Sequence, residues 1–145
     1  MVTENLTIIL AGIMFGPIIA ALVALLADFL GCILVGFGIN YIVMAGAVSI
    51  GIISGTLYKL SSKSKLPLSI RLALTVFSSH IIGSVLIKTI GLAKWYSLTY
   101  ALSFEALLLW RLLNYIVVGT VEYIILFILL RRRSFNKQIN SIIEK

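Results

Sequence analysis

Four ionisable side chains lie inside otherwise apolar stretches of this sequence: Asp28, His80, Arg111 and Glu122. If those stretches cross a membrane, each group is costly to bury and marks an ion pair, a proton path or a ligand site. Arg111 presents a planar fork of N–H donors that matches a carboxylate, and Asn114 lies about one helical turn further on, on roughly the same face. We expect both to contact a ligand; the alternative is an arginine that reaches the lipid headgroups.

Glu122 and His80 are predicted to meet in the middle of a helical bundle. Glu122 follows Arg111 by eleven positions, which places it on the same helix face, about 16 Å along the axis. His80 lies about halfway along its own apolar stretch. We predict that His80 and Glu122 form a structural pair that fixes helix packing, with a proton relay as the alternative. Asp28 is expected to hydrogen-bond backbone groups of the loop that follows it.

The composition indicates that membrane-spanning helices position these residues. Of the 145 residues, 61% are hydrophobic and 12% are charged, too few charges for a soluble domain to cover its apolar surface. Four apolar stretches approach the about 20 residues that cross a bilayer as a helix, and none alternates as a membrane strand does. They are Leu6–Leu30, Tyr41–Leu60, Leu68–Ile87 and Leu107–Leu130. We therefore predict an all-α membrane protein.

Gly16 and Pro17 interrupt the first apolar stretch. Glycine followed by proline is typical of a helix that stops and restarts, so the stretch is either one kinked helix or two helices that meet at a sharp turn. The chain then divides into a transmembrane bundle over residues 1–131 and a cytoplasmic tail over residues 132–145. The tail is either a short amphipathic helix on the inner membrane surface or a frayed end.

Basic residues predict how the bundle is oriented. They cluster in the polar break 59–71 and just after the last apolar stretch, in residues 131–137. Because cytoplasmic loops are enriched in lysine and arginine, both clusters are placed inside the cell, and the connections 31–40 and 91–103 are placed outside. Lys88 lies on the outer side against this trend, which favours an anionic ligand there.

The sequence carries no motif for catalysis. It has no phosphate-binding lysine loop, no cysteine and histidine cluster for a metal and no serine nucleophile motif. Its single cysteine, Cys32, allows no intrachain disulfide. We expect no enzymatic activity, no cofactor and no metal. We also expect no nucleic-acid binding, because the basic clusters flank membrane spans and no polar surface is available. Energy for any transport must come from partner chains.

Small residues recur at every fourth position in the first half of the chain. They are Gly12, Gly16, Ala20 and Ala24, and then Ala47, Gly51 and Gly55. Small residues at this spacing let helices approach closely in lipid. The first set is assigned to docking of a partner membrane subunit, with packing inside this bundle as the alternative.

Five short motifs follow one another along the chain. They are Ile9–Pro17 (ILAGIMFGP), Ala27–Gly31 (ADFLG), Ser54–Tyr58 (SGTLY), Leu86–Leu92 (LIKTIGL) and Leu109–Leu112 (LWRL). In this order they resemble the folate family of S components, the substrate-binding membrane subunits of energy-coupling-factor (ECF) vitamin transporters. The resemblance covers roughly residues 6–130 and favours two helices in the first stretch. The family has six helices, so it implies a bundle of about five here, without the family's first.

The resemblance implies a function in the bacterial cell membrane. Such a subunit binds folate, or a similar anionic vitamin, from the outside and associates with an ECF coupling subunit and two ATPase subunits. Arg111 would contact the ligand together with Lys88, and Tyr41, Trp95 and Trp110 are candidates for stacking on the flat pterin. Lys88 replaces an asparagine that is frequent in the family, so another small vitamin is an alternative. A small accessory membrane protein without a ligand is a further alternative.

Overall fold

The described part of the chain is almost entirely helical. The computed structural model describes residues 2–36, 38–93 and 104–131, and no strand occurs within these ranges. Its elements are α1 (Val2–Phe15), α2 (Pro17–Val35), α3 (Tyr41–Ser62), α4 (Leu68–Ser79), the π-helix η1 (His80–Ile87) and α6 (Phe104–Arg131). The predicted all-α fold is confirmed. Trp95 and the tail 132–145 lie outside the described residues.

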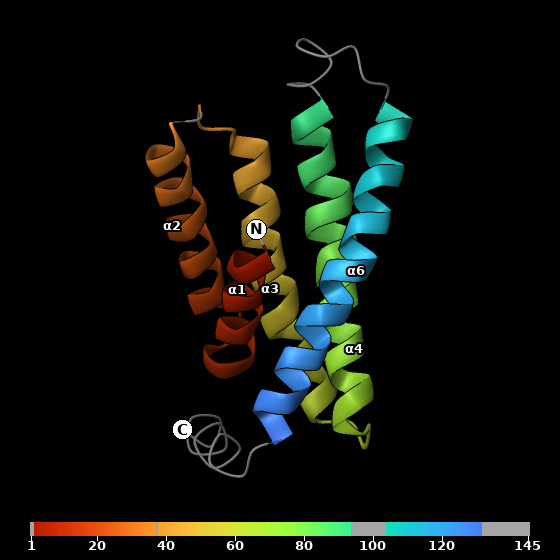
Figure 1. The fold of residues 1–145 in the computed structure, drawn as a ribbon. Coiled ribbons are helices and arrows are strands. Elements are labelled where there is room, and N and C mark those ends of the chain that lie inside the picture. Colours follow the sequence, from red (N-terminus) through yellow and green to blue (C-terminus); the bar gives the residue numbers. More distant parts are fainter. Residues whose placement is uncertain (1, 37, 94–103, 132–145) are drawn as a thin grey trace.

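Four helices are long and apolar enough to cross a membrane. They are α2, α3, the continuous helix Leu68–Ala93 that contains α4 and η1, and α6. The shorter α1 runs beside only one half of the bundle (Figure 1). The lengths and composition of these helices indicate a multi-pass membrane protein, and the bundle has the predicted five helices within the described residues.

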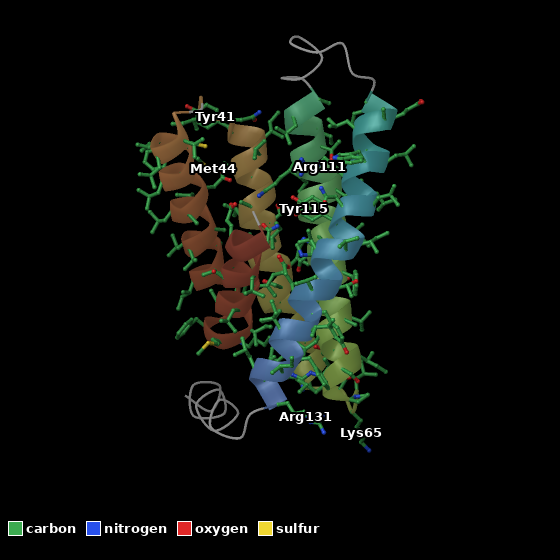
Figure 2. All side chains as sticks on the ribbon, viewed as in Figure 1. Tyr41, Met44, Lys65, Arg111, Tyr115 and Arg131 are labelled. Atoms are coloured by element: carbon green, nitrogen blue, oxygen red, sulfur yellow. The ribbon has the colours of Figure 1, made fainter. Side chains whose placement is uncertain are left out.

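The bundle has two distinct ends. We call one the basic end because Lys59, Lys63, Lys65 and Arg131 are exposed there, and Figure 2 shows Lys65 and Arg131 at the bottom of the view. Tyr41 lies at the opposite end, and Arg111, on α6, lies below it in the view, nearer to that end than to the basic end (Figure 2). The central helix is α3, which packs against α1, α2, α4 and η1, while α6 packs against α4 and η1.

The Gly16–Pro17 break separates two helices rather than kinking one. Gly16 has a φ of 87°, in the left-handed region where a residue with a Cβ is strained. Pro17 occupies the first position of α2, where a helix needs no N–H from it. The N–H of Gly16 donates to the carbonyl of Gly12 over 3.1 Å and closes α1. The chain therefore turns back on itself, and α1 and α2 lie side by side (Figure 1).

The small residues of α1 and α2 pack against α3. A Cβ on Gly55 would lie 2.8 Å from the carbonyl carbon of Gly16, and one on Gly51 would lie 2.7 Å from the carbonyl oxygen of Ala20. A Cβ on Gly12 would lie 2.9 Å from the backbone nitrogen of Gly55. Ala24 is fully buried. Packing inside the bundle therefore accounts for this stripe. Docking of a partner subunit at Gly12, Gly16, Ala20 and Ala24 stays a prediction, although α3 already packs against this stripe.

Candidate functional site

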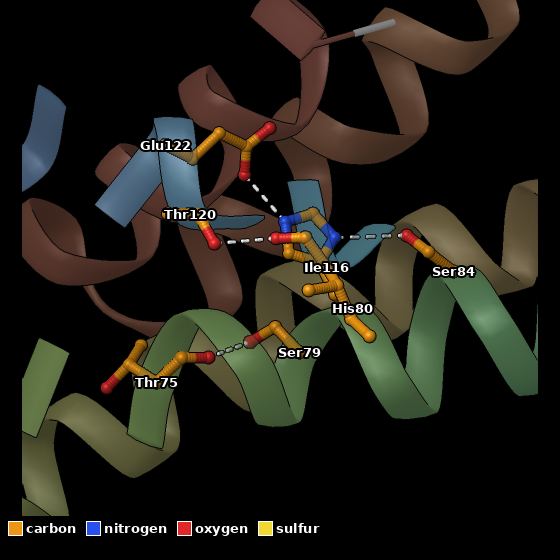
Figure 3. A network of polar contacts seen from close by, with 7 residues as sticks. All are labelled: Thr75, Ser79, His80, Ser84, Ile116, Thr120 and Glu122. Atoms are coloured by element: carbon orange, nitrogen blue, oxygen red, sulfur yellow. Dashed lines mark hydrogen bonds and ion pairs between the residues drawn. The ribbon is translucent and has the colours of Figure 1, made fainter. Parts of the chain in front are cut away.

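A buried contact between a histidine and a carboxylate joins the middle of the Leu68–Ala93 helix to the middle of α6. His80 Nε2 lies 2.6 Å from Glu122 Oε2, and the two residues are 1% and 0% exposed. The predicted His80–Glu122 pair is confirmed. Figure 3 shows the carboxylate of Glu122 pointing at the imidazole across the interface between the two helices.

The second ring nitrogen of His80 also has a partner. His80 Nδ1 lies 3.4 Å from the hydroxyl oxygen of Ser84, one turn further along η1 (Figure 3). A neutral imidazole satisfies both contacts when Nε2–H donates to Glu122 and Nδ1 accepts from the Ser84 hydroxyl. The other carboxylate oxygen, Glu122 Oε1, is buried without a hydrogen-bond partner. Glu122 and Ser84 therefore hold the two ring nitrogens of His80 from opposite sides.

The side chain of Arg111 contacts the backbone of the same serine, Ser84. Arg111 Nη2 donates to the Ser84 carbonyl oxygen over 3.0 Å and to the Tyr115 hydroxyl over 3.3 Å. The guanidinium carbon lies 5.3 Å from the centroid of the Tyr115 ring, within the range of a cation–π contact. Arg111 Nε is buried without a hydrogen-bond partner. Among the residues that the structure describes, the guanidinium is thus held at Nη2, and its Nε donor has no partner.

Tyr115 completes the arrangement. Its ring stacks on the ring of His80, with centroids 5.2 Å apart and an interplanar angle of 30°. We call Arg111, Tyr115, Ser84, His80 and Glu122 the polar network. The polar network begins at Arg111, in the half of the bundle away from the basic end, and reaches the middle of the bundle at Glu122. It links η1 to α6 twice, through Ser84 and Arg111 and through His80 and Glu122.

The π-helix explains why the Ser84 carbonyl is available. In an α-helix the N–H of Lys88 would bond to the carbonyl of Ser84, four residues earlier. Here it bonds to the carbonyl of Gly83 instead, five residues earlier. Single π-turns of this kind are often found at functional sites. The wide turn therefore leaves the Ser84 carbonyl without its α-helical donor, and Arg111 supplies one.

A second group of charges lies between α1, α2 and the Leu68–Ala93 helix. Lys88 is 6% exposed, so it points into the bundle, and its Nζ lies 3.9 Å from Glu4 Oε1. Asp28 is within electrostatic range of both, and its Oδ2 is buried without a hydrogen-bond partner. No loop begins directly after Asp28: α2 continues to Val35, so Asp28 lies inside the helix rather than beside the turn whose backbone it was expected to bond.

The remaining predicted ligand residues lie apart from the polar network. Tyr41 and Trp110 are 78% and 69% exposed, and Asn114 is also exposed. The side chain that accompanies Arg111 is therefore Tyr115, four positions on, and not Asn114, three positions on. Trp95 lies outside the described residues.

Sequence reasoning did not single out Ser84 and Tyr115. Their spacing carried a signal, since Ser84 follows His80 by four positions and Tyr115 lies four after Arg111 and seven before Glu122. These intervals place side chains on one helix face. Within the described residues, no group of three or more histidine, cysteine, aspartate and glutamate side chains could hold a metal ion.

Comparison with known proteins identifies no relative of this chain. No family model matches the chain, and neither a curated protein nor a solved structure matches it.

Proposed function

We propose that this chain is the substrate-binding subunit of a bacterial vitamin importer of the ECF type, with folate as its ligand. Two lines of support meet here. The four candidate membrane spans fit a multi-pass subunit, and the five ordered motifs resemble the folate family of S components. The alternative ligand is another small anionic vitamin, which the same arginine chemistry would bind.

The observation that carries the proposal is the state of Arg111. An arginine inside a membrane protein needs partners for its donors. Within the described residues, Nη2 donates to Ser84 and Tyr115, and Nε is buried without a hydrogen-bond partner. The guanidinium is therefore pre-oriented by Ser84 and Tyr115 and retains a donor for an incoming carboxylate. Holding a ligand-binding group in place before the ligand arrives raises affinity, because less freedom is lost on binding.

The subunit would bind and release its ligand without chemical change. Under this proposal the importer's energy comes from two ATPase subunits, and a membrane coupling subunit transmits it to this chain. The ligand enters from the end opposite the basic end. That end faces the outside if the exposed lysines mark the cytoplasm, and Arg111 lies nearer to it than to the basic end (Figure 2).

A second candidate is an accessory membrane protein that binds no ligand. It is favoured by the internal partners of the two interior cations, since Arg111 bonds to Ser84 and Tyr115 and Lys88 lies near Glu4. Under this candidate the cations serve only to hold helices together. The two candidates differ in whether the purified chain binds an anion saturably.

Calorimetric titration of folate into the detergent-purified chain separates them. We expect saturable binding to the wild type and its loss in Arg111→Ala. The matched control is Arg131→Ala, because Arg131 lies on the same helix, is exposed and is at the basic end. Thermal melting of each variant checks that it is folded. Equal binding by wild type and folded Arg111→Ala would contradict the proposal. So would the absence of binding by folate and by every other anionic vitamin in a small panel.

A further inference from the structure

We propose that Glu122, His80 and Ser84 are positioning residues for Arg111, so that a carboxylate in the middle of the bundle sets the orientation of the ligand anchor. Neither Glu122 nor His80 contacts Arg111 directly. They act through the hydroxyl and the carbonyl of one residue, Ser84, and through the ring of Tyr115. The inference rests on the proposed function only in taking Arg111 as the ligand anchor.

The first step is the double use of Ser84. Its carbonyl accepts from Arg111 over 3.0 Å, and its hydroxyl lies 3.4 Å from His80 Nδ1. Both groups belong to the π-helix, whose backbone bonds differ from those of an α-helix at this point. A change in the position of the His80 ring therefore bears on the residue that holds the guanidinium.

The second step is that the His80 ring has little freedom. Glu122 Oε2 holds Nε2 at 2.6 Å, and the ring of Tyr115 covers one face with centroids 5.2 Å apart. At Gly119 a Cβ would lie 3.4 Å from His80 Cδ2, so the backbone of α6 also borders the ring. The ring is fixed by a carboxylate, an aromatic face and a glycine, all three from α6.

The third step is that Tyr115 is shared between the two ends of the network. It stacks on His80 and accepts a hydrogen bond from Arg111 at its hydroxyl over 3.3 Å. The guanidinium is therefore joined to His80 by two routes, one through Ser84 on η1 and one through Tyr115 on α6. Two routes fix the orientation of the guanidinium as well as its distance from His80. Apolar packing of the two helices would need none of these polar groups.

The only histidine of the chain is His80, which gives the inference a direct readout without any ligand. In the full-length protein labelled with ¹⁵N-histidine and purified in detergent, every imidazole nitrogen signal belongs to His80. In the wild type, the two signals report the contacts of the ring nitrogens with Glu122 and Ser84. Arg111→Ala should shift these signals, and Arg131→Ala should leave them as they are.

A second measurement uses folate affinity in two matched serine variants. Ser84→Ala removes the hydroxyl that meets His80, whereas Ser79→Ala removes a buried hydroxyl of the same region that bonds only to Thr75, over 2.7 Å (Figure 3). A structural role alone predicts similar effects for both. Positioning predicts about a tenfold weaker affinity for Ser84→Ala and a smaller loss for Glu122→Gln, whose amide oxygen still accepts from His80 Nε2–H, with Ser79→Ala at the wild-type value.

The results that overturn the inference are specific. If Arg111→Ala leaves the His80 signals unchanged while Glu122→Gln moves them, His80 and Glu122 form a local pair and do not position Arg111. If folate binds the wild type and binds Ser84→Ala equally well, the inference also fails. If neither folate nor any other anionic vitamin of the panel binds the wild type, the proposed function fails, and the nitrogen signals alone still decide whether Arg111 and His80 are coupled.

Discussion

The Arg111 guanidinium and the Ser84 backbone carbonyl are joined across two helices by a hydrogen bond of 3.0 Å. A carbonyl acceptor cannot be removed by replacing the serine side chain. The contact depends instead on the local geometry of η1, where the N–H of Lys88 bonds to Gly83. The position of a proposed ligand anchor is thus set by a backbone irregularity in a neighbouring helix.

Replacing Glu122 by leucine should destabilise the bundle. The His80 Nε2–H would be left buried without its acceptor, a loss of about 1–3 kcal/mol. Glu122→Gln keeps an acceptor oxygen at the same position and should cost less. Thermal melting in detergent measures both. The double variant His80→Leu with Glu122→Leu should recover part of the loss, because an apolar pair leaves no unsatisfied donor. Equal melting temperatures for all four proteins would contradict a packing role for the pair.

Gly51→Ala should lower stability because its new methyl group has no room. A Cβ at Gly51 would lie 2.7 Å from backbone atoms of Ala20, and overpacking of this kind costs about 1–3 kcal/mol. The control is Gly31→Ala within α2, where no atom lies within 4 Å of the added Cβ. Gly31→Ala should melt at or above the wild-type temperature. A Gly51→Ala protein as stable as Gly31→Ala would show that α2 and α3 do not pack this closely.

Much of the fold could be predicted from sequence because lipid imposes simple rules. Span length, the restart at Pro17 and the match between small residues on two helices each follow from local composition. The His80–Glu122 pair was also accessible, since two costly groups near the same depth satisfy each other best. These features require only the residue types and their position along a helix.

The details of the site could not be predicted from the sequence, because they depend on how the helices pack against one another. The π-helix His80–Ile87 changes the rotation of the residues that follow it on the same helix, and Lys88, directly after it, lies in the interior. On α6, positions three and four residues after Arg111 both lie near its face. Only the packing against η1 selects Tyr115 over Asn114. Spacing alone could not make that choice.

Lys88 should matter more for stability than Glu4. Both Glu4 and Asp28 lie within electrostatic range of Lys88. Lys88→Gln would therefore leave two carboxylates near each other without a cation. Glu4→Gln would leave Lys88 with Asp28 as its partner. We therefore expect a loss of about 2 kcal/mol or more for Lys88→Gln and a clearly smaller one for Glu4→Gln. Melting curves give the order, and the reverse order would mean that Asp28 does not interact with Lys88.

The basic end should face the cytoplasm. After Cys32→Ser removes the only native thiol, single cysteines at Lys63 and at Tyr41 report the two ends, since both positions are exposed. A membrane-impermeant maleimide added to intact cells should label Tyr41→Cys and should label Lys63→Cys only after the cells are opened. The opposite labelling pattern would invert the bundle and place the ligand entrance on the wrong side for an importer.

Deleting Leu86 should convert the π-turn into an α-helix and test its role directly. Leu86 is 47% exposed, so its removal leaves no hole in the interior, and the His80–Ser84 spacing is unchanged. The N–H of Lys88 would then lie four residues from Gly83, and the Ser84 carbonyl would face the N–H of Thr89 at the α-helical spacing. That N–H competes with Arg111 for the carbonyl. We expect a folded protein whose folate affinity falls at least as far as that of Ser84→Ala, because the deletion disturbs the acceptor itself. Wild-type affinity in the deletion protein would show that the π-turn does not hold Arg111.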